Sequence, residues 1–322
     1  MNNVPSAVQA PTSSSRSRTL FVRCLQDSHR RKLMDAPHQK ELFISSSVFF
    51  ALQLTGGLGL SLLAIIVAAF PNVNRHPTWF SFCISWSMSA ISYSLLLLAG
   101  QKNRAPIFQL CATQAALVYS APVLTGMTTF AMFFHVYLTI HTALTKADLS
   151  RIRGLRKLLI ITPYASWTIS FVALLVFSAI KPDYVQMADN GYYCNFSTPV
   201  PKRISASVSF IFLTAIVAFE GIITVCLYRQ WRRLSTIGPK AVNMTIRVLI
   251  FGIGAILAWI LCIIYLIPVI VASPSIDIIL AILPFLGLII FATQSDLYHG
   301  RGSNRASSMS SSKLTEIPSA TL

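Results

Sequence analysis

Few residues in this sequence could do chemistry, and they are spread thinly through an apolar chain. Glu220 is the one acidic residue deep inside a long apolar run, while His135 and His141 lie near the end of another. An ionisable group inside an apolar helix is costly and usually serves a function through a definite partner. We predict a contact between Glu220 and one of these histidines that locks two helices until a switch operates. The alternatives are a Glu220 that reaches the membrane interface beside Arg229, or one that is protonated and bonded to backbone.

Two cysteines and a sequon form the second group of chemically informative residues. Cys111 opens the run that ends with the two histidines, and Cys194 lies in a polar connector, directly before Asn195. Asn195-Phe196-Ser197 is a glycosylation sequon, so we predict a glycan on Asn195, which requires the lumenal or extracellular side. The six cysteines show no metal-ligand spacing, and we expect no metal site and no cofactor.

The composition indicates which elements must position these residues. The chain of 322 residues is 54% hydrophobic and only 11% charged, whereas soluble domains carry roughly a quarter charged residues. Its apolar residues fall into seven blocks, each long enough to cross a bilayer as a helix. The sequence therefore predicts an all-α, multi-pass membrane protein with a seven-transmembrane-helix bundle over residues 43–298. The expected helices are 43–70, 79–100, 107–140, 158–180, 204–228, 245–272 and 276–298.

The distribution of Lys and Arg among the connectors predicts the orientation. With the N-terminus outside and the C-terminus cytosolic, the inner connectors carry most of these basic residues, as the positive-inside rule requires. The net charge of +16 is thus explained by insertion into a lipid bilayer, and we expect no nucleic-acid partner. We predict that residues 1–42 are disordered and outside, and that 299–322 form a disordered Ser-rich cytosolic tail. The basic N-terminal segment conflicts with this orientation, unless it is translocated regardless or Met34 is the true start.

Four stretches carry a family resemblance: SFCISWSMSAISYSLLLLAGQ, QLCATQAALVYSAPVLT, YYCNFSTPVPKRISA and ILPFLGLIIFATQSDL. They resemble the seven-helix, G-protein-coupled-receptor-like membrane proteins of mushroom-forming fungi. The LGLIIFATQ of the last helix is loosely similar to the cyclic-AMP-receptor and secretin-like branches. The rhodopsin-like motifs are missing, since HVYLTIH follows helix three in place of an Asp-Arg-Tyr triplet. The resemblance implies a receptor that binds an unknown extracellular ligand and couples to a heterotrimeric G protein.

Further residues receive roles within that architecture. We expect a disulfide between Cys111 and Cys194, because both lie on the same predicted side; two free thiols are the alternative. A mostly apolar ligand site between helices, for which ordinary packing is the alternative, would use Gln114, Val118, Tyr119, Tyr193, Trp259 and Tyr265. Basic residues of the inner connectors would dock a cytosolic partner, unless they serve only insertion and lipid contact. These are Arg151, Arg153, Arg156, Lys157, Arg229, Arg232 and Arg233.

Other functions fit the sequence less well. We expect no catalysis, because no constellation of catalytic side chains accompanies His135 inside a span. The upper half of the third helix carries no charge, which argues against a small charged ligand bound deep in the bundle. A small-molecule transporter or a non-signalling seven-helix protein is the alternative function, although the midplane lacks the charges and broken helices typical of transporters. We expect the protein in the plasma membrane.

Overall fold

The computed structural model describes most of the chain apart from its two ends and several connectors. The described residues are 36–69, 76–101, 104, 106–145, 153–188, 190–234, 239–266 and 274–293. The chain divides into two compact units, Met1–Ser45 and Ser46–Leu322, and all contacts given below lie within the second. Residues 1–35, including Met34, and the tail 299–322 lie outside the described part, so the expectations for them stay predictions.

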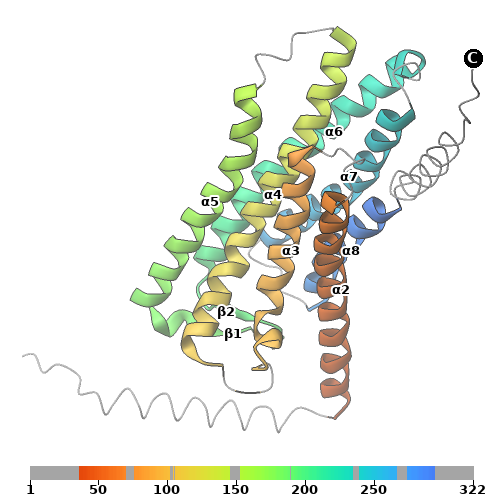
Figure 1. The fold of residues 1–322 in the computed structure, drawn as a ribbon. Helices are drawn as coiled ribbons and strands as arrows, with labels where there is room; N and C mark the ends of the chain where they lie inside the picture. The colour runs from red at the N-terminus through yellow and green to blue at the C-terminus, as the bar shows by residue number, and fades with distance from the viewer. Residues whose placement is uncertain are drawn as a thin grey trace, which may run out of the picture. The chain divides into compact units, whose positions relative to one another are not determined.

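Seven helices make up nearly all of the described chain, and each coincides with one predicted apolar block (Figure 1). They are α2 (Ala36–Ala69), α3 (Pro77–Leu98), α4 (Phe108–Thr145), α5 (Arg153–Ile180), α6 (Pro199–Leu234), α7 (Pro239–Leu266) and α8 (Pro274–Ala292). The first of them begins earlier than predicted, at Ala36, inside the segment expected to be disordered.

Five of these helices are long and apolar enough to cross a membrane. The qualifying stretches are Glu41–Ala69, Pro77–Leu98, Phe108–Thr142, Lys157–Ile180 and Pro199–Cys226. In the last two helices the described apolar stretches are shorter, Leu249–Ile264 and Asp277–Ala292. The described chain is therefore a helical protein in which several helices could span a bilayer, as the predicted all-α membrane protein requires. The number of seven spans and their orientation stay predictions.

Local sequence explains where α3 begins and ends. His76 caps its N-terminus, because the imidazole Nδ1 accepts a hydrogen bond from the Thr78 backbone N–H at 3.3 Å and Pro77 fills the first helical position. At the other end Gly100 adopts a left-handed conformation with φ of 67°. Gln101 N–H then donates to the Leu96 carbonyl at 2.9 Å, which closes the helix and turns the chain toward α4.

The helices α3 and α4 run antiparallel along their whole length. Gln114, near the start of α4, bonds to backbone near the end of α3, and Ser85 and Thr128 share a hydrogen bond of 2.7 Å halfway along. At the far ends the rings of His76 and His135 stack with centroids 3.5 Å apart. Small hydroxyl side chains buried between the two helices allow this close packing.

The glycines of α2 bring it against two other helices. A Cβ on Gly56 would lie 2.6 Å from the Phe285 backbone nitrogen of α8, and one on Gly57 would overlap the Ala90 side chain of α3. Ser87 of α3 also donates a hydrogen bond of 2.8 Å to the Gly57 carbonyl. These glycines therefore allow a close approach of α2 to α3 and α8.

A β-hairpin lies between α5 and α6, where the sequence predicted only a connector. A 3₁₀ turn at Pro182–Tyr184 leads into β1 (Val185–Met187), which pairs antiparallel with β2 (Cys194–Phe196). Cys194 and Phe196 are buried and Asn195 between them is half-buried, as the two-residue period of a strand requires. The hairpin packs against α4, near the end of the bundle where α4 begins (Figure 1).

Candidate functional site

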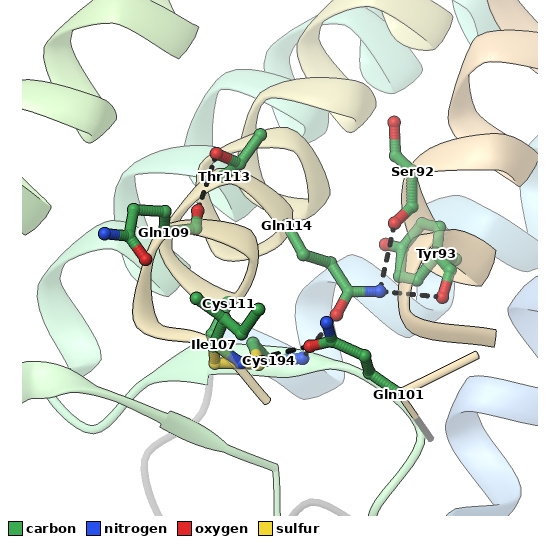
Figure 2. The surroundings of a disulfide bond; sticks show 9 residues. All are labelled: Ser92, Tyr93, Gln101, Ile107, Gln109, Cys111, Thr113, Gln114 and Cys194. Carbon is green, nitrogen blue, oxygen red and sulfur yellow. Dashed lines mark hydrogen bonds between the residues drawn. A yellow bond between two sulfur atoms is a disulfide. The ribbon is translucent and has the colours of Figure 1, made fainter. Parts of the chain in front are cut away.

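The hairpin is covalently fixed to α4. Cys111 in the first turn of α4 forms a disulfide with Cys194 of β2, and their Cα atoms lie 5.3 Å apart (Figure 2). The predicted pairing is therefore present, and the alternative of two free thiols is not. Cys194 is fully buried, together with Leu96 of α3 and Phe196, so the bond lies in an apolar cluster rather than at the surface.

Gln114 fixes the same hairpin through hydrogen bonds. Its amide nitrogen donates to the carbonyls of Ser92 at 3.2 Å and Tyr93 at 3.1 Å, both on α3. Its amide oxygen accepts a hydrogen bond of 2.9 Å from the Cys194 backbone N–H (Figure 2). Since the side chain is fully buried and uses both ends of its amide, Gln114 joins α3, α4 and the hairpin. The structure thus shows a structural role for a residue that was expected to bind ligand.

A further residue of the expected ligand site, Tyr119, also supports the hairpin. Val118 is buried in α4. The Tyr119 ring, one residue on, packs against Phe196 of β2 with centroids 5.5 Å apart, and Phe177 of α5 packs against the same Phe196 at 5.5 Å. Phe196 of the hairpin therefore packs against both α4 and α5.

Trp259 of α7 contacts α6. Its indole N–H donates to the Thr214 hydroxyl at 2.9 Å, and its ring stacks on Phe210 with centroids 5.9 Å apart. Trp259, which was expected to bind ligand, therefore packs α7 against α6. The side chain of Tyr265, expected beside it, lies outside the described part of the structure.

The sequence analysis missed Asp277, which holds the opposite side of the hairpin. Asp277 lies in the first turn of α8 and is only 9% exposed. The Asn190 amide nitrogen donates to one carboxylate oxygen at 2.6 Å, and the Tyr193 hydroxyl donates to the other at 3.2 Å. The signal in the sequence was an acidic residue at a helix N-terminus, where the helix dipole favours negative charge.

Aromatic packing strengthens this attachment. Tyr192 is fully buried, and its ring stacks on Phe49 of α2 with centroids 5.0 Å apart. Tyr193 packs edge-on against Tyr93 of α3 at 5.3 Å. The turn of the hairpin thus contacts α2, α3 and α8, while its strands contact α4. One connector therefore joins four helices at the end of the bundle where α4 begins.

Charged groups do occur at this end of the bundle, on helices other than the third of the sequence analysis. Asp277 lies in the first turn of α8, and Lys202 lies in the first turn of α6. Lys202 is half-buried. The third helix itself carries no charged residue in this region, but the fold brings charged residues of α6 and α8 to it.

Glu220 lies against α7. Its Oε2 atom is buried and has no hydrogen-bond partner within the described part of the chain. A Cβ on Gly252 would overlap the Glu220 carboxyl group, so that group occupies space left by the glycine. The described contact of Glu220 is with Gly252 of α7, and the predicted bond to His135 or His141 stays a hypothesis.

The two histidines of α4 have different surroundings. The His135 ring stacks on His76, the residue that caps α3, with an interplanar angle of 14°. The His141 ring lies 5.8 Å from the Tyr137 ring, one turn earlier in the helix, and is exposed. His135 therefore joins α4 to the start of α3.

The basic residues expected to dock a partner are only partly described. Lys157 and Arg229 are exposed. Arg151 lies outside the described residues, and nothing is described of the side chains of Arg153, Arg156, Arg232 and Arg233. Asn195, the expected glycan site, is half-buried on the hairpin face opposite Cys194, and its Oδ1 atom is buried without a described partner.

No protein-family model matches this chain, and no curated protein matches it either. A functional conclusion must therefore come from the geometry of the hairpin, the helices and the polar contacts between them.

Proposed function

We propose that this protein is a seven-helix receptor of the G-protein-coupled type, with the hairpin outside and the connectors at the opposite end in the cytosol. It binds an extracellular ligand beside the hairpin and signals by rearranging the inner ends of its helices. It has no catalytic activity of its own, and the plasma membrane is its place of action.

The observation that carries this proposal is the double attachment of the hairpin. A disulfide ties the hairpin to α4, and Asp277 ties it to α8. A ligand that moves the hairpin would therefore act on two helices at once. Disulfides persist in oxidising compartments, which supports an extracellular or lumenal position for this end of the bundle.

The opposite end of the bundle would carry the signal to a cytosolic partner. At the contact of α6 with α7, a buried carboxyl group faces Gly252, and a polar group without a described partner weakens apolar packing between two helices. Exposed cations follow on the same side, with Lys157 at the start of α5 and Arg229 toward the end of α6. Separation of α6 from α7 would open a surface on α6, the helix that carries Arg229.

Nucleotide-sensitive association with a G protein tests the proposal. The full chain is expressed in membranes and purified with a panel of Gα subunits, once after removal of nucleotide and once with a non-hydrolysable GTP analogue. We expect association in the nucleotide-free state that is lost on adding the analogue, because receptors bind empty Gα most tightly.

Charge reversal supplies a matched control. Arg229→Glu should weaken the association several-fold, whereas Arg104→Glu should leave it unchanged, because the exposed Arg104 lies in the α3–α4 connector at the hairpin end. If no Gα subunit associates, or if both substitutions act equally, the receptor proposal is refuted.

A further inference from the structure

We propose that the junction of α2, α3 and α8 is a binding site for a buried water molecule, which joins the three helices by hydrogen bonds. Its ligands are the Gln53 amide oxygen of α2, the Ser94 hydroxyl of α3 and the Leu280 carbonyl of α8. This inference goes beyond the proposed receptor function and does not depend on it, because it uses only contacts within the helix bundle.

Two buried side chains of this junction lack hydrogen-bond partners. Gln53 is 4% exposed and Ser94 is 0% exposed. Among the described residues, neither Gln53 Oε1 nor Ser94 Oγ has a hydrogen-bond partner. The hydroxyls of Ser87 and Ser92, on the same helix as Ser94, donate to a carbonyl one turn earlier. Because burying a polar group without a partner is costly, a molecule that bonds to both groups would stabilise the fold.

The packing of α2 against α3 places these two side chains opposite each other. The two helices run antiparallel (Figure 1), and a Cβ on Gly57 of α2 would overlap the Ala90 side chain of α3. One helical turn back from Gly57 is Gln53, and one turn on from Ala90 is Ser94. The two side chains are therefore at the same level and make no direct bond, an arrangement that a bridging water completes.

A proline in α8 supplies the third ligand. The helices α2 and α8 run parallel at their contact, since Gly56 packs against Pro284 and Gly59 packs against Leu288. One turn before Pro284, at the level of the buried glutamine, lies Leu280. Because proline has no N–H, the Leu280 carbonyl loses the donor that it would have in a regular helix. This carbonyl lies beneath the proline, on the side of α8 that packs against α2.

The three ligands match the bonding capacity of one water molecule. Water can donate to the amide oxygen and to the carbonyl, and it can accept from the serine hydroxyl. Buried waters typically make about three hydrogen bonds to polar groups that would otherwise lack partners. None of the three ligands carries a charge, so a bound cation would be buried without a counter-charge. The junction therefore selects for a neutral molecule that both donates and accepts.

The water would give α8 a polar link to its neighbours at the point where its own hydrogen bonding is interrupted. Water that bonds to the carbonyl freed by a proline stabilises such a helix within a membrane. The link lies between Asp277, which holds the hairpin, and Pro284, which packs against α2. It therefore fixes the part of α8 that joins the hairpin to the rest of the bundle.

The sign of a stability change tests this site. Gln53→Met keeps the size of the side chain but removes its amide, and the apparent unfolding temperature of the purified full-length protein is measured in detergent. We expect it to fall by at least about 3 °C, because the water loses a ligand. In a dry junction the same substitution would remove a buried amide oxygen that has no partner, and the unfolding temperature would rise.

Two further substitutions make the measurement specific. Gln109→Met makes the same chemical change at an exposed position of α4 and should shift the unfolding temperature by less than about 1 °C. Ser94→Ala is a smaller change that should also lower it, and it keeps the test available where Gln53→Met does not fold. The double variant should lose less than the sum of the single effects, because both remove bonds to one water.

A crystal structure at a resolution where other buried waters are visible provides the direct observation. We expect density for one water within hydrogen-bond distance of the Gln53 amide, the Ser94 hydroxyl and the Leu280 carbonyl. A direct bond between the two side chains, or an empty junction with both side chains ordered, would overturn the proposal.

A salt comparison separates water from a cation at the same ligands. The unfolding temperature is measured in sodium chloride and in choline chloride at equal concentration, and we expect no difference between them. Stabilisation by sodium that Gln53→Met abolishes would assign the site to a cation. That result, a rise in unfolding temperature on Gln53→Met or on Ser94→Ala, or strictly additive effects of the two substitutions would refute the water site and leave the receptor proposal unaffected.

Discussion

The close contact between α2 and α8 at Gly56 makes a quantitative prediction. A methyl group there would lie 2.6 Å from the Phe285 nitrogen and 2.7 Å from the Pro284 carbonyl carbon, both backbone atoms that cannot rotate away. The helices would have to separate by about 1 Å, and overpacking of this kind costs about 1–3 kcal/mol. Alanine regains about 1 kcal/mol through its higher helix propensity. We therefore expect Gly56→Ala to lower the free energy of unfolding by up to about 2 kcal/mol after this offset.

The matched control is Gly221→Ala in α6, because a Cβ at that position meets nothing within 4 Å. Unfolding is followed with a thiol-reactive fluorescent dye, which labels the buried Cys83 as the helices separate. At about 2–4 °C per kcal/mol, Gly56→Ala should unfold up to about 8 °C lower than the natural protein. Gly221→Ala should be neutral or slightly stabilising. If the two variants unfold at the same temperature, α2 and α8 do not pack as described.

Three further predictions follow from the hairpin and the α6–α7 contact. Replacing Cys111 and Cys194 together with Ala should cost about 2–5 kcal/mol and make the apparent unfolding temperature insensitive to reductant, whereas the natural protein should lose stability when reduced. If the hairpin is extracellular, Asn195→Gln should abolish the mobility shift caused by deglycosylation; an unshifted natural protein would contradict the predicted glycan. Gly252→Ala should cost about 1–2 kcal/mol in the natural chain but much less beside Glu220→Ala, and strictly additive unfolding temperatures would contradict their contact.

The helices could be predicted because each is a continuous apolar run bounded by polar or proline-containing connectors. His76-Pro77 at the start of α3 and Gly100 at its end are local signals of this kind. The Cys111–Cys194 bond could be predicted because the alternation of helices brings both cysteines to the same end. These inferences need only signals from residues that are near in sequence, or the number of times the chain crosses the membrane.

The contacts of polar side chains could not be predicted in this way. Gln114 at helical spacing behind Cys111 looks like a cavity residue, but its amide oxygen is taken by a backbone N–H that is 80 positions away. The hairpin itself was missed because its two three-residue strands are too short to show an alternating pattern. Asp277 was missed because its partners, Asn190 and Tyr193, are brought to it only by that hairpin.

The position of α8 indicates how the two ends of the bundle could communicate. Its first turn holds the hairpin through Asp277, its middle packs on Gly56 of α2, and Leu283 lies 3.3 Å from where a Cβ on Gly254 of α7 would be. Gly254 is two residues from Gly252, which faces Glu220. A displacement of α8 at the hairpin therefore has a packed route to the α6–α7 contact.

A route through packed side chains is not by itself a coupling, so this one needs a direct measurement. Asp277→Asn loosens the hairpin end and Glu220→Gln changes the α6–α7 contact, and the two positions share no contact. If α8 transmits a change between them, the unfolding free energy of the double variant should differ from the sum of the single effects by more than about 0.5 kcal/mol. The effects on the affinity for the G protein should likewise fail to add. Strict additivity in both measurements would mean that α8 joins the two regions structurally without carrying a signal, since independent distant sites add.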